Sequence, residues 1–386
     1  MDFSHMSYAS KEKPVGLNDL ELAILCWSGA GVTGAVTMED GAGQGRSISS
    51  WVGRATPNPC NIHTTKLFFT NDEGTFVYDP KTATKAVEID TDEDRERIMD
   101  YFRENCRKIM DGRLKMHAEC IPPPLVWNTN QPGTTVFIPI VDNVEAYING
   151  VFMAVAMGGY QIFDDIKGQP AGLERFIESG DLKGPKVALT SFESTNQFGI
   201  FSAPAYLLLE HIHLTAEAMG LGSVMFAGYT GEVMLGITPL GKGMAFRAIE
   251  DKAGKLNPIG LDGIFEAYCP PYYGSMDDAV DAFVEKTSGA SCAQDSEYKG
   301  VLPFDYKYWR TIRPASCRPP EKHIDMVKSY CRYIYETYGR IPALTNAKSI
   351  PIWLQVHHID IDFYERHYSQ GMITEEQKNH MRLWHG

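Results

Sequence analysis

Apolar and polar residues alternate along this chain with two different periods, which predicts helices mixed with short strands. Asn18 and Glu21 have the spacing of a helix capping box, and residues 19–28 then follow the helical period. A second helix is expected over residues 91–110, since Thr91 can cap it, acids fill its first turn and bases fill its last. Its buried face is predicted to comprise Ile98, Phe102, Cys106 and Ile109.

Strand-like segments lie between and after these helices. Residues 66–70 and 75–79 are apolar and flank the turn-forming residues 71–74, so they predict a β-hairpin. Residues 135–142 and 186–193 are short segments rich in apolar and β-branched side chains, and each is expected to form a strand. A sheet is therefore an expected part of the fold.

More helices are expected in the second half of the chain. Pro204 suits the first turn of a helix that Gly220 would end, and Ser275 is placed to cap another over 276–289. Residues 150–163 fit a buried helix and a strand equally well. Two further helices are expected over residues 323–339 and 375–385. Because helices and strands do not alternate regularly, the pattern predicts an α+β fold: an antiparallel or mixed sheet flanked by helices, with a helical C-terminal extension.

Composition narrows the class of protein. The 386 residues have ordinary globular composition and a formal net charge of −13, which opposes binding to nucleic acid or to an anionic membrane surface. No apolar run approaches the roughly 18 residues of a membrane span, and the N-terminal residues do not resemble a signal peptide. These features lead us to expect a soluble, cytoplasmic protein.

The eight cysteines are scattered and include no C-x-x-C pair, which favours reduced thiols over a disulfide framework or a zinc finger. Cys60 lies three residues before His63. Its thiol would be a nucleophile if His63 lowered its pKa, but a strand would place the two side chains on opposite faces. A buried, inert thiol is the favoured interpretation.

Residues 29–34 match the dinucleotide-binding pattern G-x-G-x-x-G. That pattern needs a strand before it and a helix after it, whereas here a capped helix precedes it and a glycine-rich segment follows. The acidic residue expected about 20 positions later is also missing. We therefore reject a dinucleotide-binding Rossmann fold and expect a helix stop followed by a flexible loop over residues 29–45.

Two blocks of sequence resemble the flavin-dependent nitroreductase superfamily, and most of all its azoline-dehydrogenase branch. The first block combines residues 21–34 (ELAILCWSGAGVTG), residues 54–70 (RATPNPCNIHTTKLFFT) and residues 74–80 (GTFVYDP). The second block, residues 203–229, resembles the long core helix of the superfamily and the glycine-rich turn after it. The chain departs from the pattern in two respects: no Arg-Arg-Ser-x-Arg run precedes Asn18, and Asn58 or Pro59 stands where the loop usually has a serine.

The resemblance implies an FMN-dependent oxidoreductase that transfers hydride through flavin N5 to or from a small organic substrate, with NAD(P)H as a donor. It also implies an intertwined homodimer with FMN between the subunits. Residues 1–254 would form the flavin-binding domain, and residues 255–386 an extension packed on the core or on the partner subunit. The residues implied to bind the cofactor are Arg46, Ser47, Arg54, Pro57, Asn58, Pro59, Asn61, Gly220, Leu221 and Gly222. No catalytic residue is assigned.

The chemistry of these residue types suits a flavin. Asn58 and Asn61 can donate amide hydrogens to ring atoms, and the prolines between them stiffen the loop. Arg54, or Arg46 with Ser47 as a replacement for the missing clamp, can neutralise a phosphate. Glycines permit close backbone approach to a ligand. A tight polar connection is the alternative for the loop taken alone, since proline and asparagine are common in turns.

The C-terminal segment is rich in histidine and acidic residues. As a strand it would place His358, Asp360 and Asp362 on one face. As a helix it would instead place His358, Asp362 and Glu365 on one face, and either set could bind a metal ion. His380 and His385 are five residues apart on a predicted helix, so they are not expected to bind one ion together. A C-terminal arm that covers a dimer interface is the favoured alternative.

Three interpretations therefore stay open: a flavin enzyme, a metal-dependent enzyme that uses the C-terminal segment, and a member of the same fold that binds no cofactor.

Overall fold

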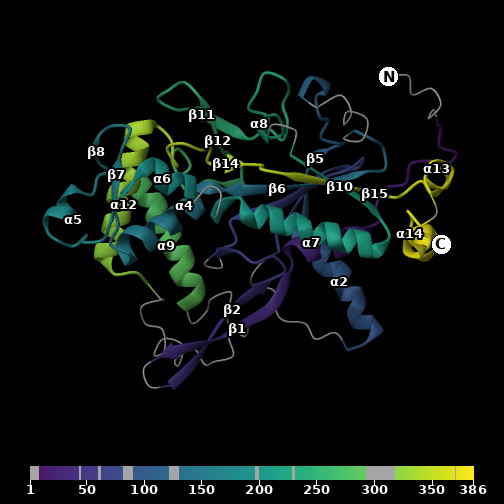
Figure 1. Cartoon of the computed structure of the whole chain (residues 1–386), viewed down its shortest axis with the longest axis horizontal. Coiled ribbons are helices and arrows are strands. Elements are labelled where there is room, and N and C mark those ends of the chain that lie inside the picture. The colour runs from purple at the N-terminus through teal and green to yellow at the C-terminus, as the bar shows by residue number, and fades with distance from the viewer. Residues whose placement is uncertain are drawn as a thin grey trace.

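The computed structural model describes residues 8–42, 45–59, 62–80, 90–120, 130–195, 200–227, 231–292, 318–369 and 371–386. At the centre of the fold lies a seven-stranded antiparallel sheet with the order β10-β15-β6-β3-β4-β5, in which β14 also pairs with β6 (Figure 1). Its strands are β3 (Thr65–Thr70), β4 (Gly74–Tyr78), β5 (Cys106–Asp111), β6 (Thr135–Asp142), β10 (Gly222–Phe226), β14 (Lys348–Ser349) and β15 (Trp353–His357). The predicted α+β class and the β3–β4 hairpin are confirmed.

The central strand β6 is buried on both faces of the sheet. Side chains alternate between the two sides of a strand, so neighbouring residues pack in different layers. Phe69 and Phe137 face α1 (Asp19–Ala30) and α7 (Ala203–Met219), which cover one side. Phe68 and Ile138 face the other side, where they belong to a cluster with Phe246 and Phe265 at a second, three-stranded sheet. That sheet comprises β11 (Arg247–Glu250), β12 (Leu256–Leu261) and β13 (Phe265–Glu266).

The other elements lie around this centre. Besides the two apolar clusters on the faces of the sheet, a third forms where α9 (Met276–Cys292) and α12 (Glu321–Tyr338) pack on the segment after β6 (Figure 1). The remaining helices are α2 (Asp92–Asn105), η3 (Ala118–Cys120), α4 (Asn143–Val151), the π-helical η5 (Phe152–Met157), α5 (Glu174–Glu178), α6 (Leu189–Thr195), α8 (Gly231–Leu235), α9 (Met276–Cys292), α12 (Glu321–Tyr338), α13 (Ile361–His367) and α14 (Glu375–Trp384). The remaining strands are β1 (Val32–Ala42), β2 (Gly45–Arg54), β7 (Gln161–Asp164), β8 (Gln169–Pro170) and β9 (Lys186–Ala188).

The starts of α1, α2 and α14 and the end of α7 agree with the sequence signals. The capping box of Asn18 is complete, since its side chain accepts from the backbone of Glu21 and the Glu21 carboxylate accepts from the backbone of Asn18. Thr91 and Thr374 begin their helices in the same way. Gly220 ends α7 with a φ of 86°, a conformation that glycine adopts without strain.

Three expectations were wrong. The flexible loop predicted over residues 29–45 is instead largely strand, because β1 pairs with β2 in an antiparallel hairpin that extends away from the body (Figure 1). The helix predicted over 91–110 ends at Asn105, and the next residues form β5 beside β4, so only part of the predicted buried stripe is helical. The strand predicted over 186–193 is short, since α6 begins at Leu189. The ambiguous residues 150–163 include both η5 and β7.

Strands from both sides of residue 254 share sheets. β12 follows this position and pairs with β11, which precedes it. β15 lies between β10 and β6 in the central sheet. The C-terminal third of the chain therefore contributes strands as well as helices. Among the described residues, no helix has both the length and the apolar character that crossing a bilayer requires.

Candidate functional site

The two sequence blocks that resemble a flavoprotein lie next to each other. Thr56, in the loop after β2, donates a hydrogen bond from Oγ1 to the carbonyl of Gly29 at 2.6 Å. The same Oγ1 lies 3.5 Å from Nδ1 of His211, in the middle of α7. A Cβ on Gly29 would lie 2.7 Å from the side chain of Ile212, so a larger residue here would force Ile212 to shift where α1 contacts α7. The first block and the second block thus form one packed unit.

The predicted cofactor residues of the loop lie at the edge of this unit. Arg54 is half-buried and donates from Nη1 to the carbonyl of Ala30 at 3.3 Å. Asn58 and Pro59 are half-buried, and Pro57 is exposed. The backbones of Arg46 and Ser47 lie in β2, while their side chains lie outside the described part of the structure, as do Cys60 and Asn61.

His63 follows this loop in an unusual backbone conformation. Its φ of 47° is uncommon for a residue other than glycine. Burial, reinforced by the nearby charges of Arg54 and Lys286, lowers the pKa of His63 to about 3, so its ring is neutral at physiological pH. A strained residue held beside a polar loop is a feature that functional sites share.

The turn after α7 makes contacts that the sequence did not indicate. A Cβ on Gly220 would lie 2.6 Å from the carbonyl oxygen of Glu376 in α14, and one on Gly222 would lie 2.7 Å from Nε2 of His357. Leu221 is fully buried. The close approach at these glycines is therefore made by the C-terminal part of the same chain. Gly220 also lies nine residues after His211, about 13 Å further along the helix than the point where α7 meets Thr56.

The metal set predicted in the C-terminal segment does not assemble. Asp360 begins α13 by accepting from the backbone of Phe363 at 3.2 Å, and it also accepts from the hydroxyl of Tyr8 at 3.0 Å. The side chain of Asp362 is 54% exposed and lies 3.9 Å from Lys11. Of the three predicted ligands, only His358 belongs to a cluster of potential metal ligands among the described residues.

That cluster, which we call the His–Glu cluster, consists of Glu21, His358, His380 and His385. Oε1 of Glu21 lies 2.6 Å from Nε2 of His380, 3.0 Å from Nε2 of His358 and 3.1 Å from Nε2 of His385. The expectation that the last two histidines could not share a site is wrong. The helix ends at Trp384, and the non-helical backbone of His385 lets its ring turn back toward Glu21.

Glu21 is fully buried yet ionised. Burial by itself would raise the pKa of its carboxyl group, but the close contact with the His358 ring and a hydrogen bond from the backbone of Asn18 outweigh that effect and lower the pKa to about 2. Sequence reasoning identified Glu21 only as a helix cap. Its Oε2 does serve the cap, which leaves Oε1 directed at the three histidines.

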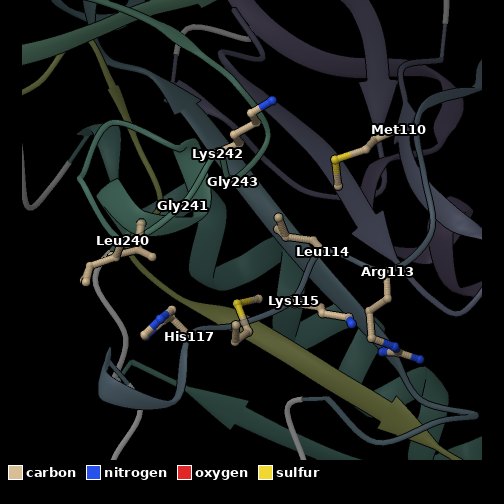
Figure 2. Close-up of a pocket in the computed structure, with 11 residues that line it drawn as sticks. Met110, Arg113, Leu114, Lys115, His117, Leu240, Gly241, Lys242 and Gly243 are labelled. Atoms are coloured by element: carbon tan, nitrogen blue, oxygen red, sulfur yellow. The ribbon is translucent and has the colours of Figure 1, made fainter.

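A separate cavity of about 490 Å³ opens between the segment after β5 and the loop after α8 (Figure 2). Arg113 and Lys115 lie at one end of it, and His117 and Leu240 lie at the other (Figure 2). Arg113 is already paired with Asp72 at 2.7 Å. None of the described residues predicted to bind a cofactor lines this cavity.

No protein-family model matches this sequence, and no curated protein is similar to it. Among solved structures, the chain is similar to one described as a "putative nitroreductase" from Ralstonia eutropha JMP134. The two share 12% sequence identity with a TM-score of 0.27, over 63% of this chain and 78% of that chain. At this level the likeness carries no argument about activity.

Proposed function

We propose that this protein is an FMN-dependent oxidoreductase that acts on a small organic substrate. The observation that carries the proposal is the contact between the loop after β2 and α7, residues that lie 155 positions apart in the sequence. These are the two blocks whose sequences resemble flavin-dependent nitroreductases. Their packing against each other supports the proposal that both blocks contribute to one cofactor site.

The residues present are compatible with the cofactor. Arg54 offers a half-buried guanidinium for a phosphate, and Asn58 offers an amide on a loop stiffened by Pro57 and Pro59. When bound, FMN would supply hydride transfer through N5, while these side chains bind and orient it. We further propose a cytoplasmic homodimer that uses NAD(P)H, in which Arg46, Ser47 and Asn61 complete the site. The C-terminal part of the same chain packs against the turn formed by Gly220, Leu221 and Gly222. We therefore propose that these three residues hold that part of the chain in place beside the cofactor site.

A metal-dependent enzyme that uses the C-terminal segment has less support. Asp360 and Asp362 are engaged with other partners, as described above. The His–Glu cluster presents four protein ligands, whereas catalytic metal sites keep a coordination position open for water or substrate.

The visible absorption spectrum of the protein, purified without added cofactor, tests the proposal. We expect oxidised-flavin bands, and about one FMN per chain in the supernatant after heat denaturation. Replacing Arg54 by Gln removes a charged hydrogen-bond donor, which is worth about 1.5–3 kcal/mol, so FMN affinity should fall roughly 10- to 100-fold.

Arg95→Gln is the matched control, because Arg95 is an exposed residue of α2 that pairs with Asp92 in the same helical turn. Its FMN affinity should equal that of the unmodified protein. A colourless, folded protein that takes up no added FMN would overturn the proposal and leave a fold without its cofactor.

A further inference from the structure

We propose that the His–Glu cluster binds one divalent first-row transition-metal ion, and that this ion fastens α14 to the start of α1. The four side chains come from the two ends of the described chain, and their ligand atoms all lie within 4.8 Å of one another. None of the four residues is among those proposed to bind FMN, so the ion can be tested without the flavin.

The hydrogen-bond partners of two histidines leave their Nε2 atoms as ligands. Nδ1 of His358 lies 2.8 Å from the carbonyl of Val15, and Nδ1 of His380 lies 2.7 Å from the carbonyl of Met219. A carbonyl oxygen can only accept, so each Nδ1 carries the hydrogen. In a neutral ring Nε2 then carries a lone pair and no hydrogen. Both Nε2 atoms nevertheless face the Glu21 carboxylate, which also can only accept, so two acceptors face each other without a hydrogen between them.

A cation between these atoms removes the conflict. A backbone carbonyl that accepts from one ring nitrogen, and so leaves the other nitrogen to bind the ion, is usual for the histidine ligands of protein-bound metals. His385 adds a third nitrogen, since its Nε2 lies 3.1 Å from Nε2 of His358 and 3.1 Å from Glu21. Two ring nitrogens that face each other this closely need either a shared proton or a shared ion.

The dimensions fit a tetrahedral ion. Metal–ligand bonds of about 2.0–2.2 Å place tetrahedral ligand atoms roughly 3.4 Å apart. The contacts to Oε1 of Glu21 are 2.6, 3.0 and 3.1 Å, so they need to open by less than about 1 Å. Three imidazoles with one carboxylate and no thiolate suit Zn²⁺, and also Co²⁺ or Ni²⁺.

Four protein ligands would fill a tetrahedral site, which is typical of structural metal ions. Glu21 lies in the first turn of α1, and His358 follows β15. His380 and His385 lie in α14 and directly after it. An ion held by all four would therefore join three separate segments, and α14 would depend on the ion for its position. The side chain of His385 is 18% exposed, which gives the ion a route of entry.

Zinc titration of the full-length protein tests this inference. The protein is treated with a chelator, dialysed and titrated with Zn²⁺, while hydrogen exchange of residues 375–384 is followed by mass spectrometry. We expect one Zn²⁺ per chain and exchange in α14 that slows at least about tenfold on saturation, because binding closes the local opening. Co²⁺ in place of Zn²⁺ should give the visible bands of a tetrahedral ion.

Two substitutions identify the ligands. Glu21→Gln keeps a residue that can complete the capping box but removes the anionic ligand, and His385→Gln lies beyond the end of α14, where it should leave the fold intact. Each should weaken Zn²⁺ binding at least about 100-fold, as even the loss of an indirect partner costs 10- to 100-fold. His323→Gln, in the first turn of α12, should bind Zn²⁺ as the unmodified protein does.

Circular dichroism would establish that each variant is folded before titration. A folded, unmodified protein that takes up less than about a tenth of an equivalent of Zn²⁺ would overturn the inference. So would Zn²⁺ affinity that both ligand substitutions leave unchanged, since that would place the ion elsewhere. Binding without slower exchange in α14 would overturn the fastening role.

Discussion

Replacing Lys348 by Met is expected to lower the free energy of unfolding by about 3–5 kcal/mol, which is the usual cost of leaving one partner of a buried ion pair alone. Nζ of Lys348 lies 2.6 Å from Oδ2 of Asp142, and both side chains are almost completely buried. The ammonium group also donates to the carbonyl of Glu266 at 3.1 Å and lies 3.5 Å above the ring of Phe265. The substitution would leave the Asp142 carboxylate without its counter-charge in the core, and urea denaturation would measure the loss.

The double variant Asp142→Asn/Lys348→Met is the control. Oδ1 of Asp142 accepts from the backbones of Val144 and Glu145 at 3.0 and 3.1 Å, and an asparagine oxygen can do the same at the start of α4. Removing both charges should therefore recover more than half of the lost stability. If the double variant is no more stable than Lys348→Met, the unpaired charge is not the cause.

Glu193→Ala is expected to have an effect of similar size, about 3–5 kcal/mol, because three donors lose the acceptor they share and two of them, from Tyr147 and Ala343, are buried. The carboxylate accepts from the hydroxyl of Tyr147 at 2.8 Å and from the backbones of Ala343 and Leu344 at 2.8 and 2.7 Å. Through these contacts α6 holds the segment after α12. Thermal unfolding of the variant would measure the loss, and Glu193→Gln, which keeps one of the two oxygens, should lose only about 1–3 kcal/mol.

The cost of Glu193→Gln should also depend on pH. Burial raises the pKa of Glu193 above its ordinary value of 4.5, because burial outweighs the hydrogen bonds that the carboxylate accepts. A group whose pKa is higher in the folded state contributes its full stability below the unfolded pKa and loses it as pH rises through the folded pKa. The stability difference between the unmodified protein and the glutamine variant should therefore shrink as pH rises from about 4.5. A difference that grows over this range would show that the pKa is lowered by folding.

Local signals in the sequence predicted the helix starts and the first hairpin. The capping boxes at Asn18, Thr91 and Thr374 rest on residues three positions apart, so they need no knowledge of the fold. The end of α2 was mispredicted for the opposite reason. Apolar residues after Asn105 continue the helical period. Cys106 nevertheless pairs with Tyr78 of β4, and this long-range pairing makes the segment a strand instead of a further helical turn.

Long-range contacts also explain what was missed at the candidate sites. Glu21 and His358 are 337 residues apart, and nothing near Glu21 in the sequence distinguishes it from an ordinary helix cap. His385 joins the cluster only because the helix stops one residue earlier, and helix ends are the least certain part of a pattern. The predicted partners Asp360 and Asp362 share a strand period with His358, but a helix begins there instead.

The position of β15 has a consequence for synthesis on the ribosome. This strand lies between β10 and β6, so residues 353–357 complete the middle of the sheet rather than its margin. While the nascent chain is being made, β6 has been translated long before this neighbour and keeps a row of unpaired backbone groups along one edge. Such an edge invites pairing with other chains until the missing strand emerges. Chaperones that shield open strand edges would thus matter most for this protein between the synthesis of β6 and the emergence of β15.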